Sequence, residues 1–503
     1  MSGLRRVLIA NRGEIAVRVI RACRELGIET VAVYSDPDRL APHVRLADRA
    51  VLVGPAPASE SYLDVGRLLE AARRTGADSV HPGYGFLAEN ASFAGLVEDA
   101  GLVWIGPPPN AIAAMGDKTE ARERMRSAGV PVIPGSEGAL DDPDAAREAA
   151  DRIGYPVMLK AAAGGGGKGM RVVRAAGEFE SAFRGARSEA GQAFGDERVY
   201  LERFLDAPRH IEIQVLADAH GRTVHVGERE CSIQRRHQKL IEEAPSPVVD
   251  AELRERMGRV AVAAAEAVGY RSAGTVEFLF QDDEFFFLEM NTRIQVEHPV
   301  TELVWEVDLV QEQLRIAGGD PILWQAPDEA PRGHAVECRI GGEDPFAGFL
   351  PSAGRVVDLE VPSGPGVRWD GGIEPGFEVG LHYDPLLAKL LVHAPTREEA
   401  IDRMARALDE LEVVGLATSA PFHRAVMREP DFRAGRLSIR YVEEHADLLR
   451  EPPNADTLRA VAAAAALLEE ERRQGAHPRT AAGTGSADGA AARSAWQRTF
   501  DPL

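Results

Sequence analysis

The sequence predicts a protein of the α/β and α+β classes with about three domains. Its 503 residues exceed the roughly 100–200 residues of one typical domain. Strand-like apolar runs alternate with helical periodicity over residues 1–105, as in an open α/β layer. Residues 333–441 instead mix strand and helix patterns, with one clear helix expected at Arg397–Leu411.

The N-terminal elements are expected in a regular order. They are Arg6–Ala10 (strand), Ile15–Leu26 (helix), Thr30–Tyr34 (strand), Tyr62–Thr75 (helix), and strand ends at Ser79–Val80 and Trp104–Ile105. The segment lacks G-x-G-x-x-G, which disfavours a dinucleotide site. Pro107–Pro109 predicts a linker to the next part of the chain.

Composition limits the classes of function. The net charge is −21 and the pI about 5.2, whereas surfaces that bind nucleic acid or anionic lipid need basic residues. No stretch approaches the ~18 apolar residues of a membrane span, and the N-terminal apolar run VLIA is too short for a secretory signal. Cys23, Cys231 and Cys338 lack the spacing of a disulfide framework or zinc site. We therefore expect a cytoplasmic protein with no nucleic-acid or membrane partner.

Lysine is rare in this chain. Lys and Arg total 58, but only five of these are lysines: Lys118, Lys160, Lys168, Lys239 and Lys389. Arginine evidently serves wherever any positive charge suffices, so the retained lysines are candidates for sites that need a compact ammonium on a flexible stem. Chance retention stays the alternative for any single lysine, but four of the five fall in the motifs described below.

A glycine-rich segment, KAAAGGGGKGM at residues 160–170, lies between two predicted strands within 155–174. Consecutive glycines let the backbone approach a ligand closely and point N–H groups at phosphate. The segment is not a Walker A loop, because position 169 is Gly where Ser or Thr is required. It predicts a flap over a nucleotide, with a plain flexible hairpin as the alternative.

Polar residues occupy every second position from 289 to 297. They are Glu289, Asn291, Arg293, Gln295 and Glu297. In an extended segment this spacing puts all five side chains on one side. A solvent-facing strand is the alternative, but clustered ionisable groups directly after the apolar run FFFL favour a functional site. We expect a metal at one end of this row and a small anion at the other.

Glu277 lies in the preceding strand, so its distance from Glu289 depends on the hairpin between them. Strands are expected at Thr275–Phe280 and Phe285–Met290. A loop of three or five residues would place Glu277 opposite Glu289 on one face, and a loop of two or four would separate them. Two carboxylates and the Asn291 amide oxygen suit Mg²⁺ bound to nucleotide phosphates; two unrelated surface acids are the alternative.

Other polar motifs are less specific. ECSIQRRHQK at residues 230–239 ends in a dense polar run. Lys239 is the notable member because it is one of the five lysines, whereas a histidine such as His237 is more often a structural hydrogen-bonding residue than an acid or base. HPGYGFL at 81–87 and ECRI at 337–340 show no chemistry on their own. After Pro452–Pro453, an Ala-rich helix is expected at Leu458–Arg472, capped by Asn454 or Asp456. Residues 475–492 predict a flexible linker before Trp496 and Phe500.

Together these segments resemble biotin carboxylase, an enzyme of the ATP-grasp family. The resemblance rests on HPGYGFLAEN, MGDK, KAAAGGGGKGM, PRHIEIQV, ECSIQRRHQK, GTVEF, EMNTRIQVEHPVTE, ECRI and FLPSAG, in order from about Arg6 to Tyr441. It implies a three-part ATP-grasp biotin carboxylase fold with a mobile glycine-rich lid. The expected parts are 1–114 (N-terminal α/β domain), 115–332 (ATP-grasp domain with a lid at about 132–205), 333–445 (C-terminal domain) and 446–503 (helical or flexible extension).

The resemblance also implies roles for individual residues. For ATP these are Lys118, Lys160, Gly166, Gly167, Glu202, Arg203, Phe204, Leu205, His210, Gln234, His237, Glu277 and Glu289. For Mg²⁺ or Mn²⁺ they are Glu277, Glu289 and Asn291. For bicarbonate they are Lys239, Arg293, Gln295 and Val296, with Glu297 as the base and Arg339 facing biotin. The catalytic set is therefore Arg293, Glu297, Lys239 and Arg339.

The sequence departs from the family pattern in a few places. Arg203 replaces a frequent Lys, Lys168 a frequent Arg, and Gly341–Gly342 a usual Asn-Ala pair. None of the five lysines follows a methionine, so no biotin attachment site is expected in this chain. Its expected partners are a biotin carboxyl carrier protein, a carboxyltransferase of an acetyl-CoA or other acyl-CoA carboxylase, and a second copy of itself. Alternatives are another ATP-grasp carboxylate–amine ligase or a non-catalytic nucleotide-binding regulatory protein.

Overall fold

The computed structural model describes residues 3–116, 118–136, 138–161, 170–325, 330–449, 461–469 and 472. The chain separates into two compact units, Met1–Arg450 and Glu451–Leu503. In the second unit residues 461–469 are helical, within the helix predicted at Leu458–Arg472. Its predicted caps, the linker 475–492, Trp496 and Phe500 lie outside the described residues. No helix in the described part of the chain has the length and apolar content that crossing a membrane requires.

The N-terminal part is the expected open α/β layer. Its five parallel strands run in the order β3-β2-β1-β4-β5. The elements are β1 (Arg6–Ile9), α1 (Gly13–Glu25), β2 (Glu29–Ser35), α2 (Pro42–Leu46), β3 (Arg49–Gly54), α3 (Val65–Thr75), β4 (Ser79–His81), α4 (Ala91–Asp99), β5 (Val103–Trp104) and α5 (Pro109–Gly116).

Two boundaries in this part differ from the predictions. The helix predicted from Tyr62 begins at Val65, because the Asp64 side chain caps it by accepting a hydrogen bond from the Arg67 N–H. Tyr62 instead is buried before the helix, and its hydroxyl donates to Asp38. The prolines predicted as a linker lead directly into α5, which begins at Pro109. Proline suits this first position, since it lacks an N–H that would have no helical acceptor.

A smaller antiparallel sheet, β7-β6-β8, lies within the predicted lid. Its strands are β6 (Val157–Ala161), β7 (Met170–Val173) and β8 (Val199–Arg203), packed with α7 (Pro143–Ile153) and α8 (Phe179–Phe194). The two strands predicted around the glycine-rich segment are therefore confirmed. The glycines themselves, including Gly166 and Gly167, lie outside the described residues.

The largest sheet is antiparallel and has the order β13-β12-β9-β10-β11-β14-β21-β19. Its strands are β9 (Arg209–Ala217), β10 (Thr223–Arg235), β11 (Gln238–Ala244), β12 (Ser272–Gln281), β13 (Glu284–Asn291), β14 (His334–Gly341), β19 (Val367–Gly371) and β21 (Leu386–Ala394). The neighbouring helices are α6 (Lys118–Ser127), α9 (Ala251–Ala267), α10 (His298–Trp305), α11 (Leu309–Ala317), α12 (Arg397–Glu410), α13 (Ala420–Val426), α14 (Pro430–Arg433) and α15 (Tyr441–Glu444).

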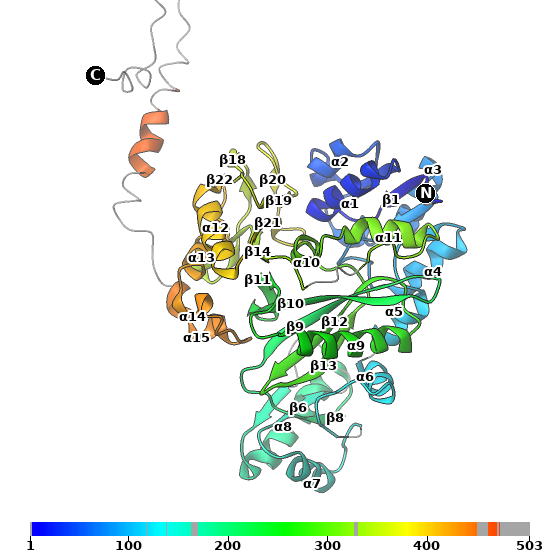
Figure 1. Cartoon of the computed structure of the whole chain (residues 1–503), viewed down its shortest axis with the longest axis vertical. Coiled ribbons are helices and arrows are strands. Elements are labelled where there is room, and N and C mark those ends of the chain that lie inside the picture. Colours follow the sequence, from blue (N-terminus) through cyan, green and yellow to red (C-terminus); the bar gives the residue numbers. More distant parts are fainter. Residues whose placement is uncertain are drawn as a thin grey trace, which may run out of the picture. The chain divides into compact units, whose positions relative to one another are not determined.

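Alternation along the strands separates an apolar face of this sheet from a polar one. Ile211, Ile213 and Val215 of β9 pack with α9 in one core, and Val336 and Ile340 of β14 pack with α12 in another. Figure 1 shows α9 near β9 and α12 near β14. The residues between them, such as His210 and Glu212, point to the opposite face. That face therefore carries buried polar groups, which need partners there.

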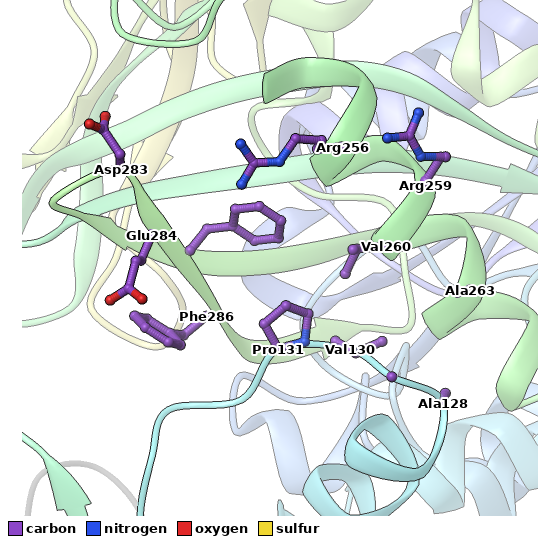
Figure 2. A pocket seen from close by; sticks show the side chains of 12 residues that line it. Ala128, Val130, Pro131, Arg256, Arg259, Val260, Ala263, Asp283, Glu284 and Phe286 are labelled. Atoms are coloured by element: carbon purple, nitrogen blue, oxygen red, sulfur yellow. The ribbon is translucent and has the colours of Figure 1, made fainter. Parts of the chain in front are cut away.

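A cavity of about 480 Å³ lies beside α9, between the turn Ala128–Pro131 and the β12–β13 hairpin (Figure 2). Its walls include Arg256, Arg259 and Phe285. None of the residues predicted to bind a ligand or metal lines this cavity. The predicted residues Lys239, Glu277 and Glu289 lie elsewhere, on the large sheet.

Candidate active site

Four charged residues form one row across the polar face of the sheet. The β-sheet register places Glu277 between Glu289 and Glu212, and Glu212 beside Arg229. Residues directly opposite in antiparallel strands share a face, so the row runs across β13, β12, β9 and β10. Glu277, Glu212 and Arg229 are buried and Glu289 is half-buried. The predicted pair Glu277–Glu289 is thus extended by two charged residues that the sequence did not single out.

The pairing of Glu277 with Glu289 depends on a β-bulge. The hairpin loop has two residues, Asp282 and Asp283, both with positive φ, and this loop length alone would put the carboxylates on opposite faces. Phe278 pairs with Phe287 but Glu277 pairs with Glu289, so Leu288 is the extra residue. The bulge shifts the register by one and returns the two carboxylates to one face.

Lys239 is the centre of the cluster. Its ammonium donates hydrogen bonds to Glu277 at 2.9 Å, to Glu297 at 2.6 Å, and to Glu212. Burial would lower the pKa of Lys239, but the surrounding carboxylates raise it well above its usual range. The lysine therefore stays charged and holds three strands and the turn at Glu297 together. Residues from separate motifs thus lie together around Lys239.

The prediction that residues 289–297 form one extended row was wrong beyond Asn291. Strand β13 ends at Asn291, and the chain then turns into α10, which begins at His298. The polar side chains still converge, because the turn directs them back toward the sheet. Gln295 donates to Glu277 at 2.7 Å and accepts from Arg229 at 2.8 Å, while Arg293 donates to Asn291 at 2.7 Å.

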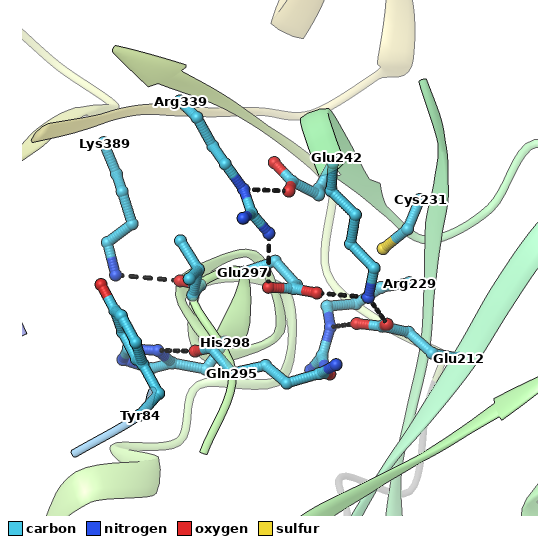
Figure 3. Close-up of polar contacts among 12 residues, drawn as sticks. Tyr84, Glu212, Arg229, Cys231, Glu242, Gln295, Glu297, His298, Arg339 and Lys389 are labelled. Carbon is cyan, nitrogen blue, oxygen red and sulfur yellow. Dashed lines mark hydrogen bonds and ion pairs between the residues drawn. The ribbon is translucent and has the colours of Figure 1, made fainter. Parts of the chain in front are cut away.

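Glu297 lies between two cations. Its Oε1 accepts from Lys239 at 2.6 Å, and its Oε2 accepts from Arg339 at 2.8 Å (Figure 3). Burial raises the pKa of Glu297, but Lys239, Arg339 and Arg229 outweigh burial and hold this pKa below its usual range. The carboxylate is therefore ionised, as a group that accepts a proton must be.

Arg339 is held on its other side by a second buried carboxylate. Its Nε donates to Glu242 at 2.6 Å (Figure 3). Burial raises the pKa of Glu242 to about 7, although Arg339 opposes the shift. Glu242 pairs across the sheet with Glu337, whose pKa burial raises well above the usual range. The guanidinium therefore reaches the turn at Glu297 from a fixed position.

Arg229 binds several members of the cluster at once. It is fully buried and donates to five side chains: Glu212, Gln214, Thr275, Gln295 and Thr301. Replacing Arg229 with Met should lower the free energy of unfolding by about 3–5 kcal/mol, because Glu212 would lose a buried partner. Urea denaturation measures this change.

A matched control for that variant is Arg259→Met in α9. Arg259 pairs with Glu255 at 3.1 Å, and both side chains are more than half exposed. Exposed pairs of this kind contribute only about 0–1 kcal/mol. Equal stability losses in the two variants would show that Arg229 is not a structural centre of the cluster.

The residues predicted to bind ATP occupy two places. Lys160 of β6 and Glu202 of β8 form an ion pair, which Arg122 joins. Arg203 pairs with Glu284 at 2.9 Å, Phe204 lies under Arg174, and Leu205 is buried.

The second place is in the large sheet, where His210 contacts Glu277 at 3.0 Å and Gln234 at 3.2 Å. His237 is exposed in the β10–β11 turn with φ of 67°. The Lys118 side chain lies outside the described residues.

The predicted metal ligands have the chemistry of a magnesium site. Glu277 and Glu289 face each other, and Asn291 follows on the same strand as Glu289. The side-chain oxygen of Asn291, the atom of this amide that could bind a cation, accepts from Arg293 at 2.7 Å. Carboxylate and amide oxygens are the ligands that Mg²⁺ prefers. The three residues therefore fit the predicted ion.

Comparisons with known proteins identify the family. The family models "Biotin carboxylase, N-terminal domain", "Carbamoyl-phosphate synthase L chain, ATP binding domain" and "Biotin carboxylase C-terminal domain" match residues 3–112, 117–323 and 337–444. The biotin carboxylase of Haemophilus influenzae is 52% identical over 442 residues, which cover 88% of this chain and 98% of that protein. This chain belongs to the biotin carboxylase family. The three-part ATP-grasp fold of the biotin carboxylases is thereby confirmed.

Two further relatives show the range of proteins to which this chain is similar. A pyruvate carboxylase subunit of Methanothermobacter thermautotrophicus is 53% identical over 440 residues, 88% of this chain and 90% of that protein. The biotin carboxylase domain dimer of Hydrogenobacter thermophilus 2-oxoglutarate carboxylase, solved with MgADP, ADP and bicarbonate, is 47% identical. It superposes with a TM-score of 0.82 over 89% of this chain and 99% of that one.

Some residues of the cluster were missed from the sequence. Glu212, Arg229 and Glu242 were not assigned to the site, although all three are fully buried and bonded within it. One signal was present: His210, Glu212 and Gln214 alternate with apolar residues as the Glu289 segment does. Nothing similar marks Arg229 or Glu242, which depend on strand pairing.

Proposed function

We propose that this site phosphorylates bicarbonate with ATP and then carboxylates biotin carried by a separate carrier protein. The observation that carries the proposal is the position of Glu297 between Lys239 and Arg339. Lys239 also contacts the row of carboxylates on the sheet, whereas Arg339 reaches Glu297 from β14. A base in this position can serve an anion bound against both cations.

Lys239, Arg293, Gln295 and the backbone of Val296 would bind bicarbonate. Glu297 would take its proton as the hydroxyl oxygen attacks the γ-phosphorus and ADP leaves. The two cations that hold the pKa of Glu297 down would then be shared with a bound anion. Each negative charge brought to Lys239 or Arg339 weakens their effect on Glu297, so substrate binding raises its pKa and makes it a stronger base.

ATP would lie against the smaller sheet and the adjoining edge of the large one. Its phosphates would contact Lys118, Lys160, Gly166 and Gly167. Its adenosine would be bordered by Glu202, Arg203, Phe204, Leu205, His210, Gln234 and His237. Glu277, Glu289 and Asn291 would hold Mg²⁺ or Mn²⁺, which supplies positive charge to the transferring phosphoryl group.

The carboxyphosphate formed in this way would transfer its carboxyl carbon to a ureido nitrogen of biotin, and the phosphate that leaves would take the proton of that nitrogen. Arg339 would stabilise the negative charge that develops on the biotin oxygen. Its guanidinium is suited to this, since Glu242 fixes its Nε and leaves the Nη atoms directed at the turn of Glu297.

The biotin carrier and a carboxyltransferase would be separate proteins of one complex, and the chain would form a homodimer in the cytoplasm. A homodimer is consistent with the dimeric Hydrogenobacter domain. The identities to a biotin carboxylase and to a protein of pyruvate carboxylase are similar and so favour neither acceptor. The carboxyltransferase would determine whether acetyl-CoA or another acceptor is used. The domain limits 1–114, 115–332, 333–445 and 446–503 stay a prediction.

The proposal is tested by phosphate release from ATP with and without bicarbonate and free biotin, followed by pull-down of the carrier. We expect hydrolysis to require bicarbonate and to rise with biotin. Arg339→Ser should lose biotin carboxylation while retaining ATP binding, because Arg339 acts in the second step. Hydrolysis that is independent of bicarbonate would refute the function. An equal loss of biotin carboxylation and of ATP binding in Arg339→Ser would refute the role of Arg339.

A further inference from the structure

Lys389 is the one lysine of the five that lies in none of the motifs, and the proposed mechanism gives it no role. It lies in β21, and its side chain is fully buried. The register pairs it directly with Arg339 of β14. Both side chains therefore project from the same face of the sheet, toward the turn that carries Glu297.

The ammonium of Lys389 joins three segments that are distant in the sequence. Nζ donates to the backbone carbonyl of Val296 at 2.9 Å (Figure 3). It also lies 3.2 Å from Glu14 Oε2. Glu14 is buried in the first turn of α1, and its other oxygen accepts from the Tyr84 hydroxyl. A chain of contacts thus runs from the N-terminal α/β layer through β21 to the turn.

The bond to Val296 controls the orientation of a peptide in this turn. A peptide group is planar, so fixing the Val296 carbonyl also fixes the direction of the Glu297 N–H. The preceding peptide is fixed independently, because the Gln295 carbonyl contacts His298 Nδ1 at 2.7 Å. Together Lys389 and His298 hold the two successive peptides that lead into Glu297.

Stability alone does not account for a lysine at this position. Desolvating an ammonium is costly, and replacing a buried ion pair with apolar residues of similar volume is often neutral or stabilising. Lys389 bonds a neutral carbonyl with part of its capacity, which returns less than a second carboxylate would. The contact is better explained by the geometry that it imposes.

We infer that Lys389 is a positioning residue for the bicarbonate step, with Glu14 as its anchor. Its ammonium holds the peptide between Val296 and Glu297, and thereby the place of the Glu297 carboxylate and of the backbone that faces the anion. The inference rests on the proposed function, since it assigns Lys389 to the same site. It adds a contact that links the N-terminal layer and β21 to the base.

The test compares Lys389→Met, Glu14→Gln and the double variant in bicarbonate-dependent ATP hydrolysis and thermal unfolding. Lys389→Met leaves Glu14 buried without its cation, so it should lower the Tm. The double variant removes both charges and should recover the Tm. In Lys389→Met and in the double variant, kcat/KM for bicarbonate should stay about 10–100-fold below wild type, since small misplacements of reacting groups have effects of this size. KM for ATP should not change.

Glu14→Gln alone keeps the bond from Lys389 to Val296 and should have a smaller effect on kcat/KM. The matched control is Arg254→Met with Glu228→Gln, which removes a buried ion pair of 2.6 Å between α9 and β10; it should leave kcat/KM for bicarbonate unchanged. Recovery of kcat/KM together with the Tm in the double variant would overturn the inference, as would an equal rise in KM for ATP. Failure of the proposed function is distinct, because wild-type hydrolysis would then not need bicarbonate.

Discussion

Glu297→Gln should abolish bicarbonate-dependent ATP hydrolysis, with a loss in kcat of about 10²–10⁴-fold, the usual contribution of a general base. The substitution keeps the shape of the side chain but removes its capacity to take a proton at neutral pH. It also places an NH2 group, which cannot accept a hydrogen bond, against one of the two cations that Glu297 contacts, Lys239 or Arg339. Phosphate release at saturating ATP and bicarbonate measures the effect.

Glu302→Gln is the matched control for this variant. Glu302 lies in α10, is buried, and accepts from Arg18 and Arg368, each at 2.8 Å. Those arginines lower its pKa below the usual range against the effect of burial, as the cations around Glu297 do. Its neutralisation should lower stability and leave kcat unchanged. Near-normal turnover in Glu297→Gln, or an equal loss of kcat in Glu302→Gln, would show that Glu297 is not the base.

Local patterns predicted the elements that depend on local forces. Strand β1, helix α1 and helix α12 begin and end within two residues of their predicted limits, because apolar periodicity and turn residues act over short distances. The convergence of Lys239 with Glu277 and Glu297 was also expected. For that prediction the resemblance was needed, since these residues come from three motifs with no periodic relation.

The parts that sequence did not predict depend on long-range register. A two-residue loop argued against the Glu277–Glu289 pair, and only the bulge at Leu288 restores it. Arg229 reaches the site because β10 pairs with β9, and Glu242 because β11 pairs with β14. Lys389 meets Val296 through a contact that spans 93 residues. No local sequence pattern encodes such pairings. In the structure, these site residues are recognised as buried charged residues in strands.

Lys239→Met should have the second large effect, on stability as well as on activity. It removes the hydrogen bonds to Glu212, Glu277 and Glu297 at once. Breaking a buried ion pair by removing one partner costs about 3–5 kcal/mol, so the free energy of unfolding should fall by at least this amount in urea denaturation. Bicarbonate-dependent hydrolysis should be lost in parallel.

The dependence of this loss on pH provides a sharper test. In the wild type the pKa values of Glu277 and Glu297 are lowered and that of Lys239 is raised, in each case against the effect of burial. The network therefore contributes its full stability between the unfolded-state pKa values, about 4 for Glu and about 10 for Lys. It loses stability only as the pH falls through the lowered carboxyl pKa values or rises through the raised lysine pKa.

Without Lys239, we expect the pKa values of Glu277 and Glu297 to rise above their unfolded-state values, because burial raises both and Lys239 is the charge that lowers them most. The native state then holds protons that the unfolded state has released at neutral pH, and stability must decrease as the pH rises. Glu242, with a pKa of about 7 in the wild type, adds to this slope in the variant, because Lys239 also lowers its pKa. Between about pH 5 and pH 8 we therefore expect a steeper fall in unfolding free energy for Lys239→Met than for the wild type. Parallel curves would show that Lys239 does not keep these carboxylates ionised.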